Sequence, residues 1–361
     1  MPDMTMRQRM LSVLQGRQAD RVPFIQYDGI IAPNDEVWAL LGRPNVGLLR
    51  WVSLHQIRAP HCRWHREQTR INGREGIRRT LHTPDGDLRD ERVIEPAYGT
   101  SAARRHFVKD PADYKPLMAY LRDCQVQTDV KGYLKHYQEL GEDGLPLLAV
   151  QRTPFQQLWI EWVCLEDLCL HLADLPELME EVAALMMNLQ RRVWQGVARA
   201  VREGVPIHFV NFPDNITAPV IGRRYFRRYC LPCYQELVAL LAETGKDVPV
   251  YVHMDGDLKP LWPAIGESGI RGLDSLSPPP DNDTSAGDVA RMWPTMRMGV
   301  NFPSSVHLRP AGEIHAAARD ILQQAGHTGR LWIQISENVP PGMWRKSYPP
   351  IVQAIEDFGR P

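Results

Sequence analysis

One imidazole and three carboxylates follow short apolar stretches of this chain, and together they could bind a metal ion or move protons. They are His253, Asp255, Asp214 and Glu337. His253 and Asp255 are two residues apart, so both side chains point to the same side if the backbone is extended, and Gly256 allows a tight turn after them. An imidazole with carboxylates suits a hard or borderline metal ion, or general acid–base catalysis.

Further polar residues also follow apolar stretches. We expect catalytic roles for two of these, Asn211 and Asn301, together with Asp214 and Asp255. We expect five residues to contact a substrate: Tyr27, Asp28, Gln151, Trp332 and Asn338. Trp332 belongs to this group because it lies near Glu337 in the sequence, whereas most other tryptophans should pack in the core. Strands of soluble proteins often end in polar residues, so it is the convergence of these side chains that indicates a site.

The elements that must position these residues are short apolar runs alternating with helical patterns. The runs are 145–151, 207–211, 248–253, 272–276, 296–301 and 331–336, and an earlier one covers 21–27. This alternation is typical of βα units with a parallel sheet. The number of runs approaches eight, which favours a closed (β/α)₈ barrel, an architecture in which active sites lie at the carboxyl ends of the strands.

The first part of the chain carries additions to this pattern. Apolar spacing predicts an N-terminal helical extension over residues 6–16, ended by Gly16. Alternating residues over 68–95, around a turn signal at 83–86, predict a β-hairpin insertion. We therefore predict one domain over 1–361, in which 1–145 holds the extension, the first strand and the hairpin, and 146–361 holds the main βα repeats.

Composition excludes several classes of protein. With 43 % hydrophobic and 24 % charged residues the chain is globular, and a net charge of −1 gives no basic footprint for nucleic acid. No apolar run is long enough to span a membrane, and the N-terminus lacks the pattern of a secretory signal. Six irregularly spaced cysteines are too few for a disulfide framework. We expect a cytoplasmic protein with a small-molecule substrate, and homodimer formation stays open.

Several motifs in order resemble the uroporphyrinogen decarboxylase superfamily, which includes corrinoid-dependent methyltransferases. The motifs are the opening at 9–23, Phe212-Pro-Asp-Asn215, the helix at 225–234, Val250-Tyr-Val-His-Met-Asp-Gly256 and the strand at 266–274. The resemblance covers nearly the whole chain and implies a distorted (β/α)₈ TIM barrel.

Two departures bear on function. Uroporphyrinogen decarboxylases carry an N-terminal arginine pair that binds substrate carboxylates, and the segment after Pro23 lacks it. The methyltransferases bind zinc through a His-x-Cys pair and a later cysteine. In this chain Asp255 occupies the position of the first cysteine, and Ser336-Glu-Asn338 ends the last strand in place of the second. A site without sulfur makes zinc a harder Lewis acid, which suits an ether oxygen better than a thiol.

The resemblance thus implies a zinc-dependent methyltransferase of the O-demethylase type, closer to the corrinoid-dependent branch than to the decarboxylases. His253 and Glu337 would bind Zn²⁺, with Asp255, or else Asp214, as the third ligand. A methyl group would pass from a small methoxylated compound to cobalamin on a separate corrinoid protein. Two alternatives stay open: a metal-free decarboxylase of a carboxylated aromatic compound or porphyrinogen, and a barrel that binds a small molecule without catalysis.

Overall fold

The computed structural model describes residues 3–30, 32–96, 100–336 and 339–360. The chain, predicted as one domain, divides into two compact units. The first comprises Met1–Leu54, Val130–Val150 and Ala200–Pro361, and the second comprises His55–Asp129 and Gln151–Arg199. The chain passes between the units several times, so neither unit is one continuous piece of sequence.

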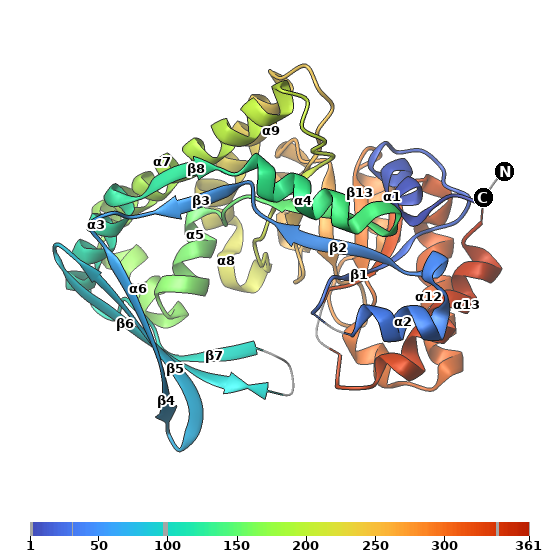
Figure 1. The fold of residues 1–361 in the computed structure, drawn as a ribbon, viewed down its shortest axis with the longest axis horizontal. Coiled ribbons are helices and arrows are strands. Elements are labelled where there is room, and N and C mark those ends of the chain that lie inside the picture. The colour runs from blue at the N-terminus through green and yellow to red at the C-terminus, as the bar shows by residue number, and fades with distance from the viewer. Residues whose placement is uncertain (1–2, 31, 97–99, 337–338, 361) are drawn as a thin grey trace. The chain divides into compact units, whose positions relative to one another are not determined.

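The first unit is a closed barrel of eight parallel strands, which confirms the predicted fold class (Figure 1). The strand order around the barrel is β1-β14-β13-β12-β11-β10-β9-β2. Their bounds are β1 Phe24–Tyr27, β2 Gly47–Val52, β9 Gly144–Ala149, β10 Val210–Phe212, β11 Val250–His253, β12 Gly272–Leu276, β13 Arg297–Asn301 and β14 Leu331–Ile335. Seven of the eight correspond to the apolar runs of the sequence, and β2 is the strand that the sequence analysis missed.

Helix α1, Met6–Leu14, closes the amino-terminal end of the barrel. Its N-cap Thr5 forms a capping box with Gln8, which satisfies two backbone donors at the helix start. Apolar side chains of α1 pack on aromatic residues inside the barrel, where Tyr251 and Trp332 stack with their ring centroids 5.9 Å apart. The barrel interior at this end is therefore filled, which leaves the opposite, carboxyl end for a site.

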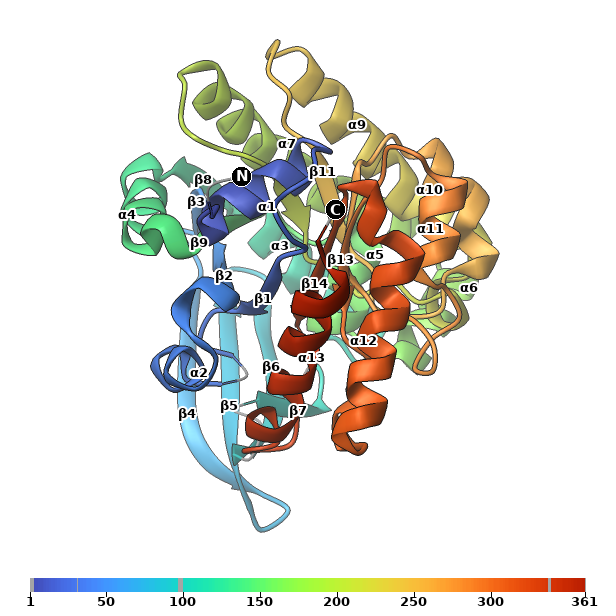
Figure 2. The ribbon, with the colours of Figure 1, turned by 90° about the vertical axis from the view of Figure 1, so that its right-hand side faces the viewer.

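Helices surround the barrel strands. Their bounds are α2 Asn34–Leu41, α4 Val130–Leu140, α8 Ala218–Tyr225, α9 Leu231–Ala242, α10 Trp262–Glu267, α11 Ala286–Met292, α12 Ala311–Ala325 and α13 Trp344–Phe358. Helices α11, α12 and α13 lie side by side on the outside of the barrel (Figure 2). Because the helices cover the outside of the barrel, its strands are buried on both faces. Their sequences are therefore continuous apolar runs.

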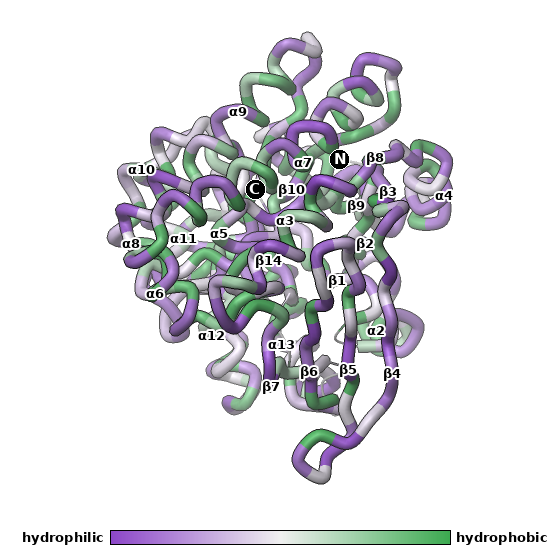
Figure 3. The backbone as a smooth tube through the Cα atoms, turned by 90° about the vertical axis from the view of Figure 1, so that its left-hand side faces the viewer, coloured by the Kyte–Doolittle hydropathy of each residue, from purple (hydrophilic) through white to green (hydrophobic). Residues whose placement is uncertain are grey.

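The second unit contains the predicted insertion, which is a four-stranded antiparallel sheet and not a single hairpin. Its strands are β4 Arg63–Ile71, β5 Arg74–Thr83, β6 Gly86–Glu95 and β7 Thr100–Arg105. The predicted turn at 83–86 joins β5 to β6, and a second turn at Asn72-Gly73 joins β4 to β5. Strand β4 is hydrophilic along most of its length (Figure 3) and largely exposed, so it gave no apolar alternation to detect.

A two-stranded sheet and four helices complete the second unit. They are β3 His55–Arg58, β8 Gln125–Thr128, α3 Tyr114–Asp123, α5 Pro154–Gln157, α6 Leu165–Asp174 and most of α7 Pro176–Arg202. The helical pattern over 155–172 is interrupted at Val163, which is in extended conformation and forms a parallel bridge with Val108. Among all the residues described, no helix is both long and apolar enough to cross a membrane.

Candidate active site at the carboxyl end of the barrel

A single buried carboxylate, that of Asp274 on β12, joins side chains from four other barrel strands. Its Oδ2 accepts hydrogen bonds from Tyr27 Oη at 2.6 Å, His253 Nδ1 at 3.0 Å and Asn211 Nδ2 at 3.1 Å. Its Oδ1 accepts one from Gln334 Nε2 at 3.0 Å. Burial alone would raise the pKa of Asp274, but the hydrogen bonds and the charge of His253 outweigh it and lower the pKa. The carboxylate is therefore ionised and fixed in place.

His253, the last residue of β11, lies between two carboxylates. Its Nδ1 bonds to Asp274, and its Nε2 lies 3.7 Å from Oδ2 of Asp255. Burial lowers the pKa of the imidazole, but hydrogen bonds to Asp255 and Asp274 and their charges raise it to about 10. Asn215 donates to the same oxygen of Asp255 at 3.2 Å, which orients that carboxylate. His253 is therefore a charged imidazolium that lies between the carboxylate groups of Asp274 and Asp255.

Aromatic rings flank this histidine on one side. Trp51 on β2 packs edge-on against Tyr27, with the ring centroids 5.5 Å apart, and lies 6.2 Å from the His253 ring. Tyr27 is nearly buried, at 3 % exposure. The rings of Trp51 and Tyr27 supply an apolar surface next to the charged groups, as is usual in small-molecule sites.

Two other predicted catalytic residues take part in separate hydrogen-bond networks. Asp214 is fully buried, and its Oδ2 accepts a hydrogen bond from Tyr234 Oη at 2.7 Å. Oδ1 of Asn301 accepts from the backbone and the hydroxyl of Ser336, both at 3.0 Å. Ser275 Oγ is 2.5 Å from Ser336 Oγ, and Ser275 has a φ of 61°, a left-handed value that is unfavourable for a serine. These networks hold the loops that follow β10, β12, β13 and β14.

The predicted substrate-contacting residues that the structure describes have different surroundings. Asp28 accepts a hydrogen bond from Asn34 and forms an ion pair with Arg50, which gives it a structural role. Gln151 belongs to the second unit. Trp332 lies in the barrel core with no exposed surface, and its indole donates to Gln334, so the structure gives it a packing role. The predicted substrate contact Asn338 and the predicted metal ligand Glu337 lie outside the described residues.

The donor atoms that face one another fit part of a metal site. Nε2 of His253 faces Oδ2 of Asp255, and Nδ1 of His253 is hydrogen-bonded to Asp274. A carboxylate at Nδ1 commonly fixes the orientation of an imidazole whose Nε2 binds a metal. No cluster of three or more His, Cys, Asp or Glu side chains suited to a metal ion occurs within the described part of the chain. The described residues therefore offer two ligands, and a third would have to come from elsewhere.

The residues that the site depends on but that were not selected from the sequence are Asp274, Gln334 and Trp51. Asp274 and Gln334 each lie near the end of an apolar run, as Asn211 does. The sequence alone does not show which polar residue at a strand end accepts hydrogen bonds from the others. Trp51 lies on β2, the strand that was missed.

A family match and one structural likeness over nearly the full chain agree with this architecture. A family model described as uroporphyrinogen decarboxylase (URO-D) matches residues 165–356, more than half of the chain. No curated protein matches the sequence. A solved structure of a methyltransferase from Methanosarcina mazei is similar over 98 % of this chain and 99 % of that chain, with 12 % identity and a TM-score of 0.56. A B12-independent methionine synthase from Shewanella sp. W3-18-1 in complex with selenomethionine is 12 % identical over 82 % of this chain and 76 % of that chain, with a TM-score of 0.41.

Proposed function

Because this chain belongs to the uroporphyrinogen decarboxylase family, we propose that it is an enzyme of the methyltransferase branch, which passes a methyl group from a small methoxylated compound to the cobalamin of a separate corrinoid protein. The likeness over nearly the full chain to a methyltransferase from Methanosarcina mazei supports this assignment. The family's decarboxylases act on anionic substrates, and the two carboxylates beside His253 would repel such a substrate.

We propose zinc as the cofactor, held by His253, Asp255 and Glu337. The main support for this proposal is that a carboxylate lies at each ring nitrogen of His253: Asp274 is hydrogen-bonded to Nδ1, and Asp255 faces Nε2. The two carboxylates give the site an excess of negative charge, which favours a divalent cation. Bound zinc would act as a Lewis acid that polarises the ether oxygen of the substrate.

The chain's own residues have separate tasks in this proposal. Asp274 orients the imidazole and is itself held by Tyr27, Asn211 and Gln334. Asn215 orients Asp255. The rings of Trp51 and Tyr27 pack against the apolar part of the substrate and exclude water from one side of His253. The reactive groups are thus fixed before substrate binds, so little reorganisation is needed.

Metal analysis of the purified protein tests the ligand assignment. We expect about one zinc per chain in the wild type and a loss of zinc in His253→Ala and Glu337→Ala, because each change removes a ligand. His315→Ala is the matched control, since His315 lies on α12 and pairs with Asp357 instead of with the site. Unchanged zinc in His253→Ala would refute the assignment.

The activity is tested separately with 2-methoxyphenol as methyl donor and cob(I)alamin as acceptor. The absorbance change of the corrin on methylation reports the transfer. We expect transfer by the wild type and by His315→Ala, and a loss in His253→Ala. Carbon dioxide release from an aromatic acid by metal-free protein, without methyl transfer, would instead establish the decarboxylase alternative.

A further inference from the structure

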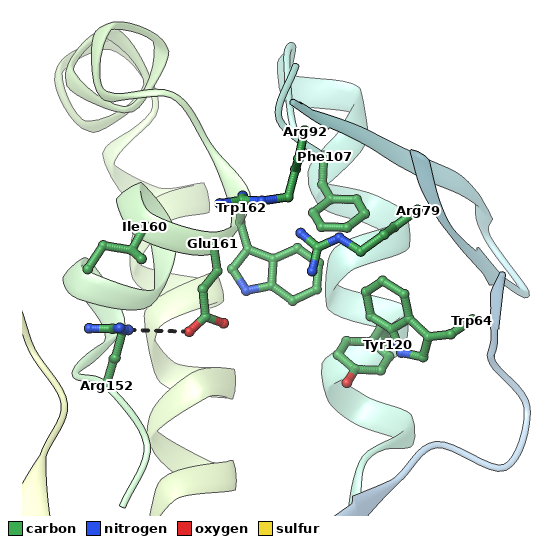
Figure 4. A pocket seen from close by; sticks show the side chains of 9 residues that line it. All are labelled: Trp64, Arg79, Arg92, Phe107, Tyr120, Arg152, Ile160, Glu161 and Trp162. Carbon is green, nitrogen blue, oxygen red and sulfur yellow. Dashed lines mark ion pairs between the residues drawn. The ribbon is translucent and has the colours of Figure 1, made fainter. Parts of the chain in front are cut away.

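The second unit has a cavity of its own, of about 450 Å³, that the proposed function does not use. This volume is in the range of small-molecule sites. The side chains that decide its character come from the sheet, from α3 and from the segments around Val108 and Val163 (Figure 4): Trp64, Phe107, Tyr120, Trp162, Arg79 and Arg92. All of them belong to the same compact unit.

Four aromatic rings form one continuous wall of the cavity. Trp162 lies 5.2 Å from Phe107, 5.8 Å from Tyr120 and 6.4 Å from Trp64 between ring centroids. Trp64 also packs edge-on against Phe107 at 5.5 Å. Trp64 is 46 % exposed, which is high for a side chain of this size. A wall of this kind fits the faces or edges of a planar aromatic ligand.

Two guanidinium groups lie on the sheet face beside these rings. Arg79 on β5 forms an ion pair with the nearly buried Asp90, and its guanidinium lies 5.0 Å from the ring centroid of Phe107. Figure 4 shows the Arg79 side chain reaching from the sheet toward Trp162. Nη1 of Arg92 on β6 is 4.0 Å from the same carboxylate of Asp90. Two positive charges thus share one negative charge.

The remaining charges in the cavity balance one another, because Arg152 and Glu161 lie 3.5 Å apart as an ion pair. The cavity as a whole therefore carries an excess of one positive charge. Burial lowers the pKa of Arg92, and the charge of Arg79 lowers it further, which Asp90 only partly offsets. A bound anion would compensate this unfavourable environment.

We propose that this cavity is a binding site for a planar aromatic carboxylate, whose ring packs against the indoles of Trp64 and Trp162 and whose carboxylate pairs with Arg92 and Arg79. Rings alone would suit any flat apolar molecule, and guanidinium groups alone would suit phosphate. Only an aromatic anion uses both. Binding at this cavity needs none of the chemistry proposed for the barrel site.

Isothermal titration with 2-naphthoate tests the proposal on the full-length protein. We expect 2-naphthoate to bind the wild type more tightly than its neutral isostere 2-naphthamide and more tightly than inorganic phosphate. Arg92→Gln should weaken 2-naphthoate binding about tenfold, since it removes a charge-assisted hydrogen bond, and Trp64→Leu should weaken it as well. The weak binding of 2-naphthamide should be unaffected by Arg92→Gln.

Arg78→Gln is the matched control. Arg78 is the neighbour of Arg79 on β5, but it points to the opposite face of the sheet and pairs with Glu67 and Glu91. Its substitution should leave the affinity for 2-naphthoate unchanged, and near-ultraviolet circular dichroism should show that each variant is folded.

Several results would overturn the proposal. The first is that the wild type binds 2-naphthamide as tightly as 2-naphthoate, and the second is that it binds inorganic phosphate as tightly as 2-naphthoate. The third is that a folded Arg92→Gln variant binds 2-naphthoate with wild-type affinity. Binding that survives Arg92→Gln and Trp64→Leu but is lost in His253→Ala would place the ligand at the barrel instead. The first two comparisons use only the wild type, so a misfolded variant does not leave the question open.

Discussion

At the scale of single residues, the barrel site depends on one acceptor. The carboxylate of Asp274 receives hydrogen bonds from Tyr27, His253, Asn211 and Gln334, and all five side chains are buried. Each donor has given up water to make its bond, so loss of the common acceptor removes four buried hydrogen bonds at once.

We therefore predict that Asp274→Ala lowers the free energy of unfolding of the barrel by about 3–5 kcal/mol. Tyr27→Phe removes only one of the four donors and should cost about 1 kcal/mol. Urea unfolding measures both. Similar effects of the two substitutions would show that Asp274 is not the common acceptor that the geometry makes it.

A second residue-scale prediction concerns His307, which is buried and hydrogen-bonded to Ser347 of α13 at 2.7 Å. Burial lowers the pKa of this imidazole from 6.5 to about 4. Between these two pH values the unfolded chain binds a proton that the folded barrel does not. His307 therefore makes the barrel less stable as the pH falls from 6.5 to 4, by about 3 kcal/mol in total.

The check is the pH dependence of urea unfolding for wild type and His307→Asn. Asparagine keeps a polar group near Ser347 but does not titrate, so the variant should lose less stability than the wild type between pH 6.5 and 4. Any cavity left by the substitution affects all pH values alike. Parallel curves for the two proteins would contradict the assigned pKa.

At the scale of elements, the insertion sheet is defined by its turns. The turn Asn72-Gly73 joins β4 to β5 with φ values of 51° and 76°, the left-handed pair typical of a two-residue hairpin. Glycine adopts this conformation without strain, whereas residues with a Cβ atom adopt it at a cost in conformational free energy. No atom would contact a Cβ at Gly73 among the described residues, so the cost of substitution is conformational only.

We predict that Gly73→Ala destabilises the second unit by about 1–2 kcal/mol. Gly312→Ala in the first turn of α12 is the control, since φ there is negative and the site is equally open, and it should be neutral or slightly stabilising. Thermal unfolding of both variants measures the difference. A neutral Gly73→Ala would mean that the hairpin does not hold this turn in solution.

At the scale of the whole molecule, the chain forms two compact units, each built from separate stretches of sequence. Each has its own core, since the barrel encloses Tyr251 and Trp332 while the second unit packs Phe107 against Trp162. Proteins with more than one such unit often unfold in more than one step.

We predict that hydrogen exchange resolves these steps. Under mild denaturant, amides of β4–β6 should exchange together, at a rate different from that of the barrel strands. Gly73→Ala should accelerate exchange in β4–β6 and leave β11 and β12 unchanged. Uniform acceleration across both units would show that they unfold as one.

The sequence by itself determined the barrel, because buried parallel strands produce continuous apolar runs that can be recognised locally, and it placed His253, Asp255 and Asn211 at strand ends. It missed β2, whose apolar run is interrupted by Arg50, and it reduced the insertion to one hairpin because β4 is exposed and polar.

Only the tertiary structure decided which polar residues act together. Closure of the barrel brings together strands that are far apart in the chain. As a result Asp274 accepts hydrogen bonds from several strands, and Trp332 lies in the core. In the same way, the rings and guanidinium groups of the second cavity come from segments separated by up to about a hundred residues. Local patterns record burial and conformation, whereas contacts between distant segments depend on register and closure, which no single stretch of sequence contains.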